Sequence, residues 1–327
     1  MLAAPSTAPA ARRRLAFGAL AAAASTLLAG CGSWASPSAE PGAAVSVVAS
    51  FYPLEFAVSQ VGGDPVRVTS LTKPGAEPHE LELRAKDVAA VSKSELVVYA
   101  KGFQPAVDTA VDQEAGDHAL DVTQVASLDL PALPEDDSRV GGVLTAAEGR
   151  NSDAPADPHF WLDPQRYAAV GTAIARRLQS LDPADAEAYS RNAAAFTDRL
   201  TVLDEEFRTG LASCRSTELV TSHAAFGYLA ERYGLTQVAV TGLSPDAEPS
   251  PARLAAVADY VRQHHITTIY AETLVEPAFA ETVAQSTGAR VATLDPLEGL
   301  TDSSAGHDYF EVMRSNLATL RTGQGCA

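Results

Sequence analysis

The sequence predicts an α/β protein of two lobes, each built on a mostly parallel sheet flanked by helices, with one long rigid helix joining them. Two observations lead to this prediction. Short β-rich runs alternate with helical patterns before residue 123 and again after residue 213, the order expected of parallel strands with crossover helices. Between these two regions, apolar residues recur at helical spacing along about thirty residues.

The first lobe is predicted to span residues 44–182. Its expected strands are 45–50, 66–71 and 95–100, and its expected helices are 54–61 and 85–93. Gly62-Gly63 ends the first of these helices, because glycine is a poor helix former. From about residue 123 to 156 the pattern breaks, and proline, glycine and acidic residues predict a long acidic loop.

The connecting helix is predicted at residues 183–212, with Asp182 as its N-cap and Pro183 in its first turn. Its apolar stripe consists of Tyr189, Ala193, Phe196, Leu200, Leu203, Phe207 and Leu211. The second lobe follows at residues 213–327. Its expected strands are 217–222, 237–241, 267–272 and 290–295, and its expected helices are 223–233, 250–264, 276–286 and 306–322.

The N-terminus has the pattern of an export signal. Three arginines, Arg12 to Arg14, precede the apolar run from Leu15 to Leu28, which is too short to span a membrane. The sequence Leu28-Ala29-Gly30-Cys31 then resembles a bacterial lipobox, in which Cys31 carries the lipid. We therefore expect residues 1–30 to be a lipoprotein signal peptide and residues 31–43, which are small and polar, to be a flexible tether.

Charge and cysteine content narrow the range of partners. The formal net charge is −17, and removal of the signal peptide takes three arginines and no acidic residue, which leaves −20. No basic block remains to bind phosphate backbones, so nucleic acid is excluded as a partner. The two other cysteines, Cys214 and Cys326, would lie in an oxidising compartment, where a disulfide between them is the default expectation.

Four candidate metal ligands follow predicted strands or lie in loops. His79 is in the loop after strand 66–71, His159 is in the segment DPHFWLDP (157–164), and His223 follows strand 217–222. Asp295 ends strand 290–295. Ligands of open α/β sheets bind beyond the carboxyl ends of the strands, so these side chains could meet in a cleft between the lobes. Three imidazoles and one carboxylate form a set suited to Zn²⁺.

These segments resemble those of the metal-binding receptors of bacterial ABC importers, the ZnuA/TroA-like cluster of solute-binding proteins. The resemblance rests on PGAEPHELE, DPHFWLDP, VTSHAAFGYLAERYGL, TLDPLEG and DYFEVMRSNLATL, and it covers residues 45–323. It implies that Phe160 and Trp161 pack around His159. Glu272 could hold a ligand in place or serve as an alternative oxygen ligand, and it ranks below Asp295.

The resemblance implies a monomeric, lipid-anchored, extracytoplasmic receptor that carries Zn²⁺ to an ABC permease and its ATPase, with no enzymatic activity. Relatives that prefer manganese place a carboxylate where His223 stands, so His223 favours zinc. The alternatives are a manganese or iron receptor of the same family and a secreted zinc hydrolase, for which Glu272 is the candidate general base. A third alternative is an adhesin, a role claimed for several relatives.

Overall fold

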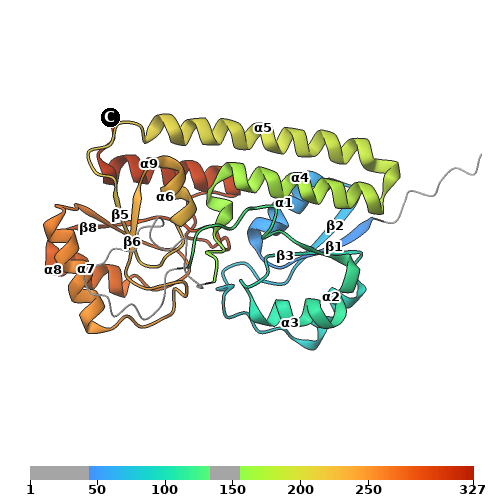
Figure 1. Ribbon diagram of the computed structural model, residues 1–327, viewed down its shortest axis with the longest axis horizontal. Helices are drawn as coiled ribbons and strands as arrows, with labels where there is room; N and C mark the ends of the chain where they lie inside the picture. Colours follow the sequence, from blue (N-terminus) through green and yellow to red (C-terminus); the bar gives the residue numbers. More distant parts are fainter. Residues whose placement is uncertain (1–43, 133–154) are drawn as a thin grey trace, which may run out of the picture. The chain divides into compact units, whose positions relative to one another are not determined.

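The computed structural model describes residues 44–132 and 155–327, all within one compact unit that begins at Gly42. This unit contains two four-stranded sheets, and neighbouring strands of the described residues pair in parallel in both sheets. The predicted α/β class with two parallel-sheet lobes is therefore confirmed (Figure 1). The predicted signal peptide, the tether up to Ala43 and residues 133–154 of the predicted acidic loop lie outside the described residues.

The first sheet has the strand order β2-β1-β3-β4. Its strands are β1 Val45–Ala49, β2 Val66–Ser70, β3 Leu96–Tyr99 and β4 Ala119–Asp121. Its helices are α1 Tyr52–Gly62, α2 Ala85–Lys93 and α3 Pro105–Glu114, and the 3₁₀ turn η1 spans Gly116–His118. The three predicted strands are confirmed to within a residue or so, whereas α3 and β4 were not predicted.

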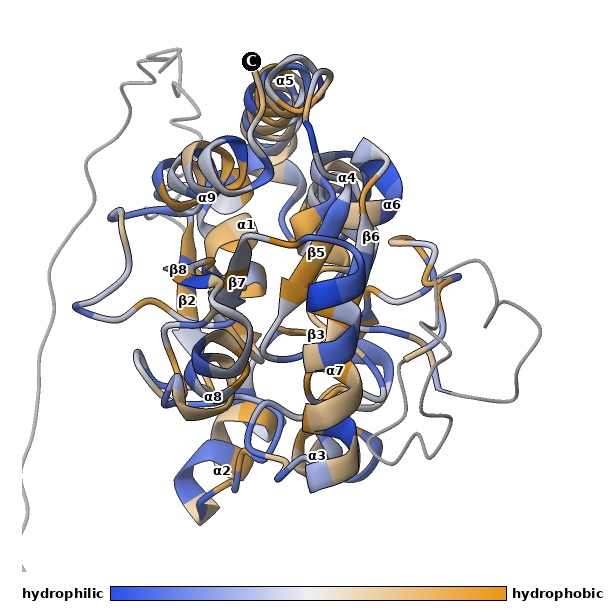
Figure 2. Ribbon diagram, turned by 90° about the vertical axis from the view of Figure 1, so that its left-hand side faces the viewer, coloured by the Kyte–Doolittle hydropathy of each residue, from blue (hydrophilic) through white to orange (hydrophobic). Residues whose placement is uncertain are grey.

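The second sheet repeats the same order, as β6-β5-β7-β8. Its strands are β5 Glu218–Thr221, β6 Thr236–Ala239, β7 Thr268–Ala271 and β8 Arg290–Thr293. Its helices are α6 Gly227–Tyr233, α7 Pro251–Gln263, α8 Ala278–Thr287 and α9 Tyr309–Gln324. Figure 2 shows β5 as largely hydrophobic and α7 with alternating polar and apolar residues, which is the pattern of a buried strand covered by surface helices.

Two long helices connect the sheets. Helix α4 spans Pro164–Leu181, and the Asp163 carboxylate caps it by accepting from the Gln165 amide. Helix α5 spans Ala186–Gly210 and buries its predicted apolar stripe. The two helices approach closely at Gly171, where an added Cβ would lie 2.8 Å from the Phe196 ring. A larger residue there would push α4 away from α5.

The N-cap prediction for the long helix was wrong in one detail. Asp182 accepts a hydrogen bond from the Ala184 amide and so caps η3, a 3₁₀ turn over Pro183–Asp185, rather than α5 itself. Pro183 fits the first position of that turn because its missing amide hydrogen is not needed there. Among the described residues, no helix is long and apolar enough to cross a membrane.

A disulfide closes the second lobe. Cys214, just after α5, is bonded to Cys326, just after α9, so the structure contains the predicted pair. The amides of Arg215 and Ser216 both donate to the Gln324 carbonyl beside it. The end of the chain is thereby fixed against the start of the second sheet.

Candidate metal centre

Three histidines and one glutamate meet at the carboxyl ends of the strands. His79 lies in the loop after β2, His159 immediately precedes the 3₁₀ turn η2 (Phe160–Leu162), and His223 follows β5. Glu298 lies in the segment between β8 and α9. Each residue offers one ligand atom, and the four atoms lie within 4.8 Å of one another. The structure therefore brings together the three predicted histidines from segments far apart in the sequence.

The Glu298 carboxylate is the centre of this cluster. Its Oε1 lies 3.2 Å from Nε2 of His79, 3.0 Å from Nε2 of His159 and 3.3 Å from Nε2 of His223. His159, His223 and Glu298 are fully buried, and His79 is 8% exposed. Glu298 Oε2 is also buried and has no hydrogen-bond partner among the described residues, so it remains available to a cation.

Asp295, the predicted fourth ligand, is not part of the cluster. Its Oδ1 accepts from the Leu297 amide and its Oδ2 accepts from the Ser304 hydroxyl, each at 2.8 Å. The side chain of Asn316 in α9 bonds both the amide and the carbonyl of Asp295. Asp295 thus holds the turn that presents Glu298, whereas sequence reasoning selected it because it ends the strand.

Two further carboxylates orient the imidazoles from behind. Asp157 Oδ1 accepts from the amide of His159 and lies 2.7 Å from its Nδ1. Glu272 Oε1 accepts from the amide of His223, lies 2.5 Å from its Nδ1 and also accepts from the Ser222 hydroxyl. Each carboxylate directs Nε2 of its histidine toward Glu298. The structure thus places Glu272 behind a ligand, one of the two roles considered for it, and Asp157 was not singled out from the sequence.

The buried charges shift the protonation of the metal-free site. Burial alone lowers the pKa of His159, but the carboxylates of Asp157 and Glu298 outweigh it and raise that pKa. Burial is likewise outweighed at His223, where Glu272 and Glu298 raise the pKa well above its ordinary value. Burial raises the pKa of Glu298, yet the three histidines hold it well below its usual range. A metal ion must therefore displace protons from the imidazoles when it binds.

Aromatic side chains enclose the site. The Trp161 ring lies 5.2 Å from that of His159, and the Phe103 ring lies 4.6 Å from that of His79, between ring centroids. The Trp161 indole donates to the Pro296 carbonyl at 2.7 Å, and the Tyr309 hydroxyl donates to the Trp161 carbonyl. These contacts cover the buried imidazoles and connect the loop of His159 to the loop of Glu298.

Glu272→Gln tests the role of the carboxylate behind His223. The amide cannot act as a strong acceptor for Nδ1–H, so the imidazole loses both basicity and a fixed orientation. We expect Zn²⁺ affinity to fall by about 10- to 100-fold, measured by competition with a chelator. Glu276→Gln is the matched control, because Glu276 lies outside the cluster and its partners, and it should leave the affinity unchanged. Equal affinities of Glu272→Gln and wild type would contradict the assignment.

Two parallel-sheet lobes, a long helix between their sheets and a buried cluster of three histidines and one glutamate define a class, the two-lobed metal-binding proteins of the ZnuA/TroA-like fold. The chain belongs to the ZnuA family, described as zinc-uptake complex component A, periplasmic, whose profile matches residues 47–323.

Three similar proteins illustrate the match. The zinc-binding lipoprotein AdcA of Streptococcus pneumoniae serotype 4 is 37% identical over 284 residues, which cover 85% of this chain and 55% of AdcA. The high-affinity zinc uptake system protein ZnuA of Bacillus subtilis is 32% identical over 300 residues, 90% of this chain and 93% of that protein. Because the matched residues cover 55% of AdcA, this chain spans only about half the length of that relative.

The third is a solved structure, the Zn(II)-bound ZnuA-like domain of Streptococcus pneumoniae AdcA. It superposes with a TM-score of 0.68 at 35% identity, over 86% of this chain and 99% of that one. The sequence match thus shows the family, and the structural match shows the fold.

Proposed function

We propose that this chain is an extracytoplasmic receptor that binds Zn²⁺ and delivers it, as a monomer, to an ABC permease with its ATPase. One observation carries the proposal: three imidazole Nε2 atoms converge on one buried carboxylate oxygen between the strand ends of the two sheets. Membership of a zinc-uptake family and the zinc-bound structure of a relative support it.

The donor set favours zinc over manganese and iron. Zn²⁺ accepts three nitrogen ligands and one carboxylate in a four-coordinate site, whereas Mn²⁺ favours oxygen ligands. The site offers three imidazoles from His79, His159 and His223. A nitrogen-rich site also binds Zn²⁺ more tightly than Mn²⁺ in the general order of divalent affinities.

The same geometry favours a receptor over a zinc hydrolase. Catalytic zinc sites use three protein ligands and keep one position for water, whereas four protein donors converge here. Glu272, the candidate general base, is engaged through Oε1 with Ser222 and His223. It therefore orients a ligand instead of facing a water that could attack a substrate.

A competition titration tests the choice of metal. With chelator-buffered Zn²⁺ and Mn²⁺, we expect the wild type to bind one ion per chain and to bind Zn²⁺ far more tightly. His223→Glu should narrow the difference between the two metals, because it replaces a nitrogen ligand with an oxygen ligand. Equal or tighter binding of Mn²⁺ by the wild type would overturn the zinc assignment.

Location on the cell surface is the second part of the proposal, and it rests on the lipobox that ends at Cys31. A lipid on Cys31 and the short tether would keep the receptor within reach of a permease. Cys31→Ser should leave the protein unprocessed or release it from the membrane fraction, as seen by fractionation and immunoblotting. Membrane association and mobility identical to those of the wild type would exclude this anchor.

A further inference from the structure

A groove of about 1050 Å³ lies at the opposite end of the second sheet from the histidine cluster. We call it the basic groove. Its charged lining residues are Arg215, Glu218, Arg262, His264, His265 and Arg290. We propose that the basic groove is a second binding site, which takes a ligand bearing two or more phosphate groups.

The charge balance of the groove is opposite to that of the chain. The protein has a net charge of −17, yet three arginines and two histidines line the groove beside one carboxylate. That carboxylate, Glu218, accepts a hydrogen bond from the Tyr260 hydroxyl. No carboxylate of the described residues lies within ion-pair distance of Arg215 or Arg290, although Arg262 pairs with Asp259. Two exposed guanidinium groups thus remain free to bind an anion.

The helix ends at the groove account for only part of this charge. Helices α7, α8 and α9 all end there, and the negative ends of their dipoles favour nearby cations. Arg262 and His264 lie at the end of α7 and are explained in this way. Arg215 lies against Gly325, the C-cap of α9, so the same explanation applies to it. Arg290 begins the strand β8 and is not part of a helix end.

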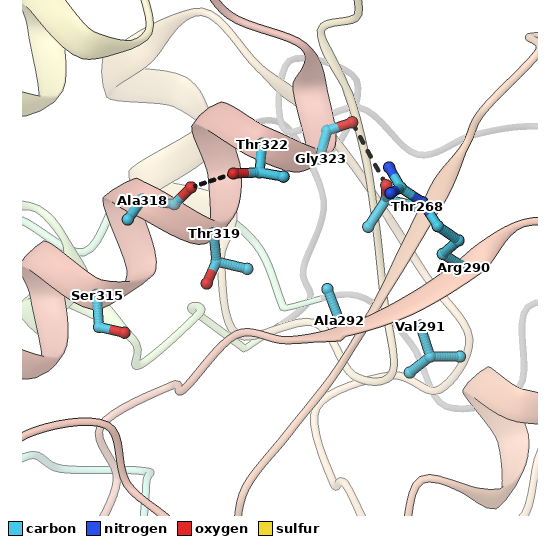
Figure 3. A pocket seen from close by; sticks show the side chains of 9 residues that line it. All are labelled: Thr268, Arg290, Val291, Ala292, Ser315, Ala318, Thr319, Thr322 and Gly323. Atoms are coloured by element: carbon cyan, nitrogen blue, oxygen red, sulfur yellow. Dashed lines mark hydrogen bonds between the residues drawn. The ribbon is translucent and has the colours of Figure 1, made fainter.

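The disulfide fixes one wall of the groove. Arg215 follows Cys214 directly, and Gly325 precedes Cys326. Gly325 has a φ of +65°, and an added Cβ would lie 2.6 Å from Arg215 Nε, so the guanidinium lies directly over this glycine. On the other side, Figure 3 shows Arg290 alongside Thr268, where the basic groove adjoins a smaller groove between β8 and α9.

Phosphate is the group that this arrangement suits. A guanidinium presents its N–H donors in a planar fork that matches two phosphate oxygens, and hydroxyls of Ser216 and Thr217 line the same groove. Such groups occur in soluble oligophosphates and in anionic phospholipid headgroups. The groove lies at the starts of β5 and β7, whereas His223 and Glu272 follow their ends, so the two sites can be tested separately.

The test uses the complete chain from residue 31, with Cys31→Ser so that no acyl chain contributes, in metal-free form because pyrophosphate chelates Zn²⁺. Calorimetry with inorganic pyrophosphate measures the soluble source. Sedimentation with vesicles of phosphatidylcholine that contain cardiolipin, whose headgroup carries two phosphates, compared with pure phosphatidylcholine vesicles, measures the headgroup source. We expect the protein to bind pyrophosphate, the anionic vesicles or both, and we expect added salt to weaken this binding. Failure of both probes to bind at low ionic strength would overturn the proposal.

Two double variants that remove the same charge distinguish binding in the basic groove from a general effect of net charge. Arg215→Gln/Arg290→Gln should weaken binding at least about tenfold, because one charge-assisted hydrogen bond is worth roughly that factor. Arg191→Gln/Arg314→Gln removes the same charge outside the groove and should have little effect. Both variants should keep the Zn²⁺ affinity of the wild type, which shows that they fold. An equal loss of phosphate binding in the two double variants would show that net charge causes the binding, and it would contradict a specific site in the basic groove.

Discussion

Glu298→Ala is expected to weaken Zn²⁺ binding by more than about 100-fold. This is a larger loss of affinity than that expected on removal of a residue that only orients a metal ligand, which is about 10- to 100-fold. Three histidine Nε2 atoms surround Glu298 Oε1, and the residue is fully buried. Its removal leaves three imidazoles and no anionic donor to complete the zinc site. The affinity is measured by competition with a chelator, and the thermal unfolding of the metal-free variant shows whether it folds.

Asp295→Ala is the comparison that distinguishes the two carboxylates. Its oxygens are bonded to the Leu297 amide and the Ser304 hydroxyl, so this change loosens the turn and removes no donor from the cluster. We expect a smaller loss of Zn²⁺ affinity than for Glu298→Ala. The reverse order, with Asp295→Ala the more damaging, would restore Asp295 as the ligand and refute the role of Glu298.

Removal of the disulfide is expected to lower the free energy of unfolding by up to about 5 kcal/mol in the chain-entropy account. The bridge joins cysteines 112 residues apart, so it restricts a large part of the unfolded chain. The measurement is urea unfolding of Cys214→Ser/Cys326→Ser and wild type, both with a chelator, because bound metal would stabilise either protein. Unchanged unfolding midpoints would show that the bridge contributes little. Zn²⁺ affinity should change little, because the bridge lies at the opposite ends of the strands.

The elements that the sequence predicted well are those with strong periodicity. Strand β1 is apolar at four of its five positions, and α5 repeats apolar residues at spacings of three and four over 25 residues. Helix α3 lacks such a signal, because only Val107, Ala110 and Val111 of its residues are buried. Strand β4 has three residues, too few for alternation to show.

The predicted histidines lie together where a strand end determines the position of a side chain. His223 lies two residues after the end of β5, and the chain stays non-helical until α6 begins at Gly227, later than the predicted residue 223. Glu298 depends on a turn instead. Leu297 has a φ of +60°, and Asn316, about twenty residues further on, holds that turn through Asp295. Sequence reasoning selected the segment that contains both Asp295 and Glu298 but could not tell which of the two carboxylates lies beside the histidines.

The hydrogen bond from the Trp161 indole to the Pro296 carbonyl has a thermodynamic consequence for metal capture. This bond joins Trp161, in the loop of His159, to Pro296, in the loop of Glu298, in the absence of an ion. The conformational entropy that is lost when these donors come together is therefore lost during folding and not when the ion binds. Binding of the ion then orders little additional chain. We expect the ordering entropy of capture to be small and the hydrogen exchange of these two loops to be nearly the same with and without metal. The receptor would therefore meet the ion with its donors already assembled.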